Sequence, residues 1–251
     1  MKISNLLITI FMTSAITVSA QKKTNQKTEN KDEIASLIPE NDWIKSEDPN
    51  TIIFPVAFIW EYTTEWLEED EYGREGELWA YYHPELKYWL FTRDTYGVSA
   101  DMFDWVLVKP DGSAILRSKD EFGKSETEEI KLDFNQDKSI FEVYKPNSKT
   151  ITYNQNDLGF PPIEGKGYSV TYEKTSDKSE YFLVETDIDF APLHNFRLLN
   201  EHTEAYIHVP FSDEIPDNYL LLESQLDTPY GRLASKLKSI SHTYYEINLK
   251  N

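Results

Sequence analysis

Runs of β-branched and aromatic residues alternate with tight-turn residues along most of this chain, and this alternation restricts its fold more than any other feature. The clearest case is Pro110-Asp111-Gly112, which separates the apolar runs 105–109 and 113–118. Proline presets φ, aspartate can bond its own backbone and glycine accepts a positive φ, so these residues predict a tight turn. His83-Pro84-Glu85 separates two further runs in the same way. The sequence therefore predicts successive β-hairpins.

The same pattern continues on both sides of these turns. Residues 51–67 predict a first strand with Phe58 and Trp60 on one face and Ile59 and Glu61 on the other. Turn residues at Lys145-Pro146-Asn147-Ser148 and Thr175-Ser176-Asp177 predict two more hairpins. We expect other strands at residues 78–82, 87–92, 140–144, 150–153, 168–174, 181–187 and 204–209, a strand or bridging segment at 218–226, and one or two final strands within 236–249. Residues 32–38 predict one or two helical turns, and 192–200 a helical turn or a loop. The predicted fold class is mainly β: a curved antiparallel sheet or half-barrel meander with short helices.

The N-terminus predicts export. Lys2 is followed by an apolar run from Leu6 to Ile16, and Val18-Ser19-Ala20 supplies the small residues that signal peptidase requires. We interpret residues 1–20 as a signal peptide, 21–31 as a disordered leader and 32–251 as a single β-rich domain. No later apolar run is long enough to predict a membrane-spanning segment. The expected location is the periplasm or the extracellular space, after cleavage near Ala20.

Composition narrows the classes of function. The chain contains no cysteine, which excludes thiol catalysis, thiolate zinc sites and acylation of a lipobox cysteine. Its formal net charge of −19 argues against nucleic acid as a partner, because an acidic surface repels phosphates. The same charge suits divalent cations, a cationic substrate or simple solubility. These features are typical of an acidic, exported bacterial protein, and we expect no cofactor and no metal.

The order of the predicted elements resembles a known family. Pro216-Asp217-Asn218-Tyr219-Leu220-Leu221-Leu222-Glu223 is followed by the apolar run 237–240 and by Tyr245-Glu246-Ile247-Asn248-Leu249. With the strands before them, these segments resemble the half-barrel carriers and sensors related to the periplasmic lipoprotein carrier. The resemblance implies a strongly curved antiparallel sheet that folds over short helices and leaves an apolar concavity for acyl chains. It assigns no functional residue.

Polar clusters offer little specific chemistry. His202, Glu204, Tyr206 and His208 alternate and would share a strand face, but two histidines six residues apart in an extended strand lie about 20 Å apart, too far for one ion. Asp187 and Asp189 could form a carboxylate pair for glycoside hydrolysis. Glu68-Glu69-Asp70-Glu71 lacks the spacing of an EF-hand loop. In a chain this acidic, an ordinary charged surface explains all three clusters.

Aromatic residues are the least ordinary feature. We name Trp60, Tyr62, Trp79 and Tyr81 as candidate ligand-binding residues, because flat side chains on a sheet can stack on sugars or line a lipid groove. The alternative is that they fill the core.

Three classes of function remain open. We favour an exported, soluble, non-catalytic binding protein that carries or senses an apolar or amphipathic ligand, such as a lipid or glycan, in a concavity of its sheet. One alternative is a secreted enzyme that acts on extracellular glycans. Another is a structural or envelope-interaction protein without a small ligand.

Overall fold

A computed structural model describes residues 36–38, 42–66, 75–92, 103–119, 122–132, 134, 145–171, 178–194, 215–229 and 231–250. All of them belong to one compact unit, Ile34–Asn251. The expected signal peptide and leader, the acidic loop at Glu68–Glu71 and the alternating residues His202, Glu204, Tyr206 and His208 lie outside the described residues.

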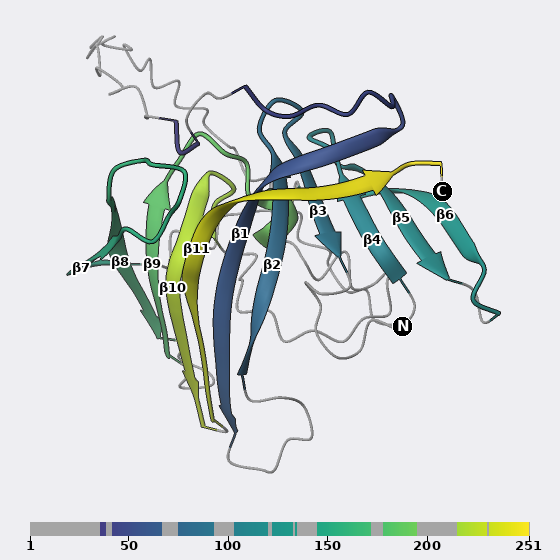
Figure 1. Ribbon diagram of the computed structural model, residues 1–251. Coiled ribbons are helices and arrows are strands. Elements are labelled where there is room, and N and C mark those ends of the chain that lie inside the picture. Colours follow the sequence, from purple (N-terminus) through teal and green to yellow (C-terminus); the bar gives the residue numbers. More distant parts are fainter. Residues whose placement is uncertain are drawn as a thin grey trace, which may run out of the picture. The chain divides into compact units, whose positions relative to one another are not determined.

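The described strands form one sheet of eleven, in which every neighbouring pair is antiparallel (Figure 1). The order across the sheet is β6-β5-β4-β3-β2-β1-β11-β10-β9-β8-β7. The bounds are β1 Thr51–Trp66, β2 Glu75–His83, β3 Tyr88–Thr92, β4 Phe103–Val108, β5 Ser113–Lys119, β6 Ser125–Lys131, β7 Lys145–Tyr153, β8 Ile163–Thr171, β9 Lys178–Glu185, β10 Tyr219–Thr228 and β11 Gly231–Asn248. The short helix α1 spans Ala191–His194. The predicted mainly β, antiparallel meander is confirmed.

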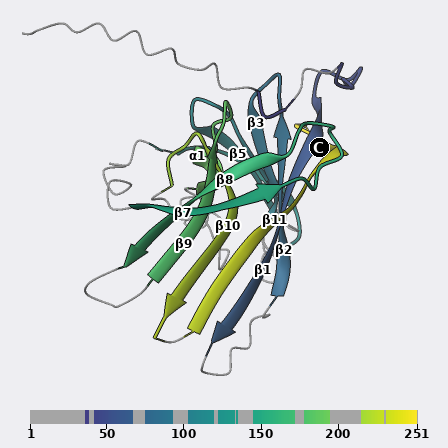
Figure 2. The ribbon, with the colours of Figure 1, turned by 90° about the vertical axis from the view of Figure 1, so that its left-hand side faces the viewer.

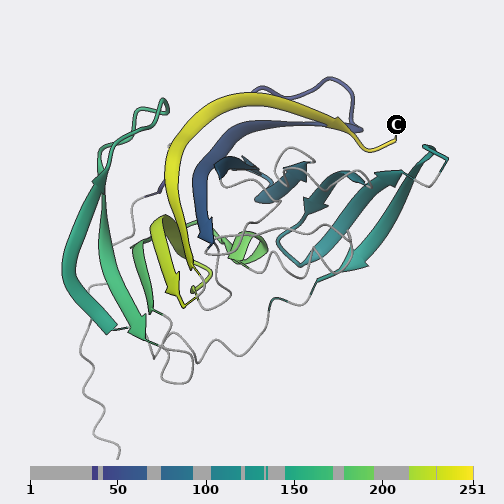
Figure 3. The ribbon, with the colours of Figure 1, turned by 90° about the horizontal axis from the view of Figure 1, so that it is seen from below.

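Two meanders meet at the centre of this sheet. Strands β1 to β6 run in chain order toward one edge, and β7 to β11 run from the other edge back to the centre, where β11 pairs with β1. Figure 2 shows β9, β10, β11, β1 and β2 side by side in that order. In Figure 3, β1 and β11 bend along their length and α1 lies within the curve of the sheet. None of the described helices is long and apolar enough to cross a membrane.

The inner face of the sheet, which carries Phe58 and Trp60, holds the larger apolar cluster. Phe58 stacks on Trp60 with ring centroids 5.9 Å apart and meets Phe190 edge-on at 5.5 Å. Phe190 directly precedes α1 and Leu193 lies in it, and both are buried. This segment therefore covers the inner face with side chains.

The outer face is covered in part by the sheet's own central strands. β2 pairs with β1 only from Val56 onward, and β10 pairs with β11 only up to Lys236. Residues 51–55 of β1 and 243–248 of β11 therefore form a two-stranded extension, which we call the ribbon. Figure 3 shows the bent ends of β1 and β11 passing over β2 and β3. The ribbon packs into a second apolar cluster, the outer cluster: Ile52, Phe54, Ala57, Ile59, Trp79, Tyr81, Tyr88, Leu90, Trp105, Leu107, Ile115, Tyr245, Ile247 and Leu249.

Two register shifts mark the central pair. Between Phe54 and Val56 the partner strand advances from Tyr245 to His242, so β11 has one residue more than β1 there. Pro55 lies opposite this bulge, where its missing N–H costs no ladder bond. The second shift makes Lys238 the extra residue, between the partners of Ile59 and Trp60.

Two of the four predicted turns, at His83-Pro84-Glu85 and Pro110-Asp111-Gly112, are confirmed, and one is wrong. The fourth, Thr175-Ser176-Asp177, lies outside the described residues. In the predicted turn after residue 109, the N–H of Gly112 donates to the Lys109 carbonyl at 3.0 Å, and the φ of Gly112 is +78°. Lys145-Pro146-Asn147-Ser148 forms no hairpin turn and lies inside β7. β7 ends the described sheet, and its register shifts between Pro146 and Thr150. An edge strand can accommodate proline, so turn residues form an irregular stretch of strand there.

Two further differences concern local structure. β6 was not predicted, because Glu126, Glu128 and Glu129 leave its sequence without an apolar period. Residues 36–38, the described part of the first expected helical turn, are not helical. The second expected turn, within 192–200, contains only the end of α1 among its described residues.

Candidate functional site

The structure divides the four candidate aromatic residues between core and surface. Trp60 is fully buried on the inner face, and its Nε1–H donates to the Leu221 carbonyl at 2.9 Å. Tyr81 is 6% exposed in the outer cluster, with its ring centroid 4.4 Å from that of Tyr245 in the ribbon. These two side chains serve as core. Tyr62 and Trp79 are only partly buried.

Trp79 borders a polar part of the outer face. Its Nε1–H donates to Oε2 of Glu77 at 3.0 Å, two residues away on β2. Glu77 also pairs with Lys238, the extra residue of the second bulge. Hydrogen bonds from Lys238 and then from Trp79 lower the pKa of Glu77 below its ordinary value. The indole and this carboxylate therefore hold a defined orientation.

Beside Trp79, four central strands enclose an open hollow of about 580 Å³. Three consecutive residues of each strand line it: Glu61, Tyr62 and Thr63 of β1, Glu75, Gly76 and Glu77 of β2, Glu223, Ser224 and Gln225 of β10, and Ala234, Ser235 and Lys236 of β11. In each trio the middle side chain shares a parity with the inner face, as Tyr62 does with Trp60. The outer two side chains of each trio point to the outer face, so the hollow lies there.

Strand register sets the lining of the hollow in two rows. Glu61 lies between Glu77 and Lys236, and Lys236 faces Glu223. The second row runs Glu75, Thr63, Ala234 and Gln225 in the same strand order. Side chains directly opposite each other on neighbouring strands lie about 5 Å apart at Cβ. The first row thus presents ionised groups, and the second presents an acid, a hydroxyl, a methyl group and an amide.

Negative charge dominates this hollow. Its described lining contains four glutamates and one lysine. Glu61 and Glu77 are direct neighbours across the strand pair, where like charges repel, and Lys238, which pairs with Glu77 and also attracts Glu61, offsets part of this repulsion. Lys236 faces both Glu61 and Glu223, so one ammonium offsets two carboxylates. A cationic group of a ligand would relieve this imbalance.

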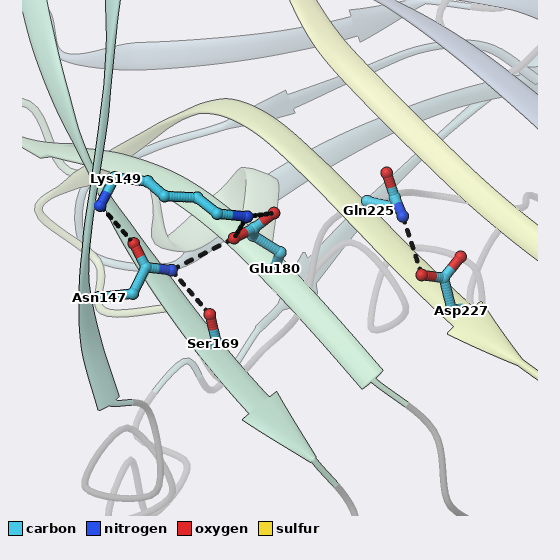
Figure 4. A network of polar contacts seen from close by, with 6 residues as sticks. All are labelled: Asn147, Lys149, Ser169, Glu180, Gln225 and Asp227. Atoms are coloured by element: carbon cyan, nitrogen blue, oxygen red, sulfur yellow. Dashed lines mark hydrogen bonds and ion pairs between the residues drawn. The ribbon is translucent and has the colours of Figure 1, made fainter.

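Hydrogen bonds fix polar side chains beside the hollow (Figure 4). Nε2 of Gln225 donates to Asp227 at 2.8 Å, and Asp227 pairs with Arg232 at 2.6 Å. These contacts orient the Gln225 amide.

Further along the sheet, Lys149 of β7 pairs with Glu180 of β9 at 2.7 Å. The same Glu180 accepts a bond from Asn147, which also donates to Ser169 of β8 at 2.7 Å. The strands β7, β8 and β9 are thus joined by side chains as well as by backbone hydrogen bonds.

Asp187 and Asp189 have structural partners. They follow β9 and do not share a strand face as expected, because the strand ends at Glu185. Asp187 Oδ1 accepts the Leu37 N–H at 2.8 Å, and Asp189 Oδ1 accepts the Ala191 N–H at the start of α1 at 2.9 Å. Burial, and then these two carboxylates, raise the pKa of Tyr82 above its ordinary value. Both acids help to position the segment that covers the inner face, and neither lines the hollow.

Within the described part of the chain, no three histidine, aspartate or glutamate side chains are grouped closely enough to hold a metal ion. No model of a known protein family matches the sequence, and no curated protein is detectably similar to it.

The hollow was missed by sequence reasoning. The alternation of Glu61 and Thr63 on the outward face of the first strand was visible in the sequence. Its partners on β10 and β11 depend on register between segments more than 150 residues apart, as the contact between Lys238 and Glu77 illustrates. A local pattern does not contain that information.

Proposed function

We propose that the protein is an exported, non-catalytic binding protein that holds a glycan in the hollow on the outer face of β2, β1, β11 and β10. The observation that carries this proposal is the combination of a preformed hollow, polar side chains fixed by register and the partly exposed ring of Trp79 at its border. The volume of the hollow falls within the range of about 300–1,000 Å³ that is typical of small-ligand sites.

The chemistry of the lining favours a sugar over an acyl chain. Carboxylates accept hydrogen bonds from hydroxyl groups, and the Gln225 amide can both donate and accept. An indole offers a flat apolar surface to the C–H face of a sugar ring. An acyl chain would instead leave these polar groups desolvated without partners, at a cost in free energy. The inner face, where the family resemblance places an acyl ligand, carries the packed side chains of Phe190 and Leu193.

The charge of the hollow favours a glycan with amino groups. An ammonium near Glu61 and Glu223 would add opposite charge where one lysine offsets two acids. Exposed ion pairs contribute about 0.2–1 kcal/mol each, so two such pairs change affinity by roughly tenfold.

Calorimetric titration with three β-1,4-linked hexamers tests this proposal: cellohexaose, hexa-N-acetylchitohexaose and the glucosamine hexamer. They share a backbone and differ at the C2 substituent, so they separate sugar recognition from charge recognition. We expect the glucosamine hexamer to bind most tightly. The double variant Glu61→Gln/Glu223→Gln should weaken its binding by about tenfold and leave cellohexaose nearly unchanged.

Matched variants locate the site. Glu128→Gln removes an exposed acid from β6, away from the hollow, and should not change binding. Trp79→Ala should weaken the binding of all three hexamers, because the ring contact does not depend on charge. If none of the hexamers binds, or if Glu128→Gln has the same effect as the double variant, the hollow is not a glycan site.

A further inference from the structure

The ribbon is attached to the rest of the sheet by side chains. Its two strands pair with each other from Thr51 with Asn248 to Phe54 with Tyr245. The described pairing of β2 with β1 begins at Val56, beyond this region. Side-chain packing in the outer cluster therefore holds the ribbon in place, without a strand ladder to β2. The bulge opposite Pro55 lies at its base, where an extra residue already bends the strand pair.

A histidine ring lies under this ribbon. His83, the last residue of β2, is 6% exposed, and its ring meets Phe54 of the ribbon edge-on with centroids 6.2 Å apart. Its Nδ1 accepts the Leu86 N–H at 3.2 Å. An imidazole that accepts through Nδ1 is neutral and carries its proton on Nε2. His83 is therefore neutral when the ribbon is packed on the outer cluster, as it is in this structure.

The charged groups near His83 do not offer it a free counterion. Glu85 in the adjoining turn and Lys45 of the segment before β1 pair with each other at 2.7 Å. From β1 the neighbour is the apolar ring of Phe54, and the register partner on β3 is Tyr88. Burial is the largest influence on His83 and lowers its pKa, while Glu85 and then a hydrogen bond with the backbone of His83 itself oppose that shift, and Lys45 adds to it.

We propose that His83 makes the ribbon an acid-sensitive cover, which packs on the outer cluster at neutral pH and loosens from it when His83 gains a proton. Protonation converts Nδ1 from an acceptor to a donor, which ends its bond with the Leu86 N–H. It also places a charge against Phe54, where burial disfavours it. Movement of the ribbon lets the imidazolium reach water.

Opening would uncover a specific surface. The buried side chains beneath the ribbon include Tyr81, Leu90, Trp105 and Leu107. Two of the four are aromatic, so acidification would present a flat apolar area on a face that is closed at neutral pH. This device is separate from the glycan hollow and does not depend on it.

The sign of the pH dependence follows from the two states of His83. Its pKa is lower in the closed state than the value of about 6.5 for a solvated histidine. The closed state is therefore fully favoured above about pH 6.5 and loses stability as the pH falls below that value. One proton changes the opening equilibrium by at most about tenfold for each pH unit below 6.5.

Thiol labelling of the full chain tests this proposal, because the absence of natural cysteines makes single-cysteine variants unambiguous. Ile247→Cys places a thiol on the buried side of the ribbon, and Glu246→Cys places one at the neighbouring exposed position. The ratio of the two maleimide rates cancels the intrinsic pH dependence of the thiol. We expect this ratio to rise by about tenfold between pH 7.5 and pH 5.0.

Two histidine variants identify the responsible group. His83→Asn keeps an acceptor near the position of Nδ1 but cannot titrate, and should abolish the rise. His242→Asn removes the exposed histidine at the base of the ribbon and should leave the rise intact. A flat ratio in the parent protein, or a rise that persists in His83→Asn, overturns the proposal. If Ile247→Cys does not fold, Tyr245→Cys against the same exposed reference gives the same comparison.

Discussion

At the scale of single residues, backbone conformation and the space around a side chain decide the roles of two glycines. Gly112 and Gly123 both have a φ of +78°. A Cβ added at Gly112 would lie 2.5 Å from the backbone oxygen of Leu132, whereas one added at Gly123 would meet no atom within 4 Å. The first position therefore has a steric requirement that the second lacks.

We predict that Gly123→Ala lowers the free energy of unfolding by about 1 kcal/mol, the cost of a left-handed residue with a side chain. Gly112→Ala should lower it by roughly 1–3 kcal/mol more, because the backbone oxygen cannot move aside as a side chain can. Urea denaturation of the two variants gives this difference. Equal losses would show that the turn between β4 and β5 can move away from the Leu132 backbone.

The burial of the candidate aromatic residues could not be predicted from the sequence, because it also depends on which distant residues surround each side chain. Alternation correctly assigned Trp60 and Ile59 to opposite faces of one strand. It did not reveal that both faces are covered there, since the cover of the outer face comes from residues near 51 and 247. Tyr81 is buried by this distant segment, and Trp79, on the same face, is only partly buried.

At the scale of elements, the ribbon explains why two aromatic neighbours should respond differently to substitution. Tyr81 packs on Tyr245 of the ribbon, whereas Trp79 lies at the border of the hollow.

We predict that Tyr81→Ala lowers the free energy of unfolding by about 3 kcal/mol, as expected when a large buried ring is removed. Trp79→Ala should cost about 1 kcal/mol, because much less buried area is lost. Thermal melting of the two single variants measures this difference. If Trp79→Ala is as damaging as Tyr81→Ala, Trp79 belongs to the core and its role at the hollow is withdrawn.

Turn residues correctly predicted where internal strands end, but they predicted a turn inside an edge strand. Pro110-Asp111-Gly112 forms the expected turn, with the Asp111 carboxylate accepting the Ser113 N–H at 2.9 Å. Pro146 and Asn147 have the same preferences but lie in the edge strand β7, where Asn147 accepts the Lys149 N–H at 2.9 Å. A local bond of the kind that normally closes a turn instead shapes an irregular strand, and only tertiary context distinguishes the two.

At the scale of the whole molecule, export with cleavage of a signal peptide remains the prediction that the sequence supports most directly. We expect protein recovered from the periplasm or the culture medium to begin at Gln21, because Val18 and Ala20 satisfy the requirement for small residues before the cleavage point. N-terminal sequencing of the recovered protein checks this. An intact Met1, or recovery from the cytoplasm alone, would contradict it.

The pairing of β1 with β11 has a consequence for how the chain reaches this fold. Asn248 donates to the Thr51 hydroxyl across 197 residues of intervening sequence, within the strand pair that is central in the strand order. Each meander can form its own hairpins early, but the seam that joins the halves must wait until β11 has been synthesised. Such high contact order slows folding, since a long loop must close before its contacts are gained. A nascent chain would thus leave the ribosome with its two halves still separate, in a form that a translocation channel for unfolded polypeptides can accept.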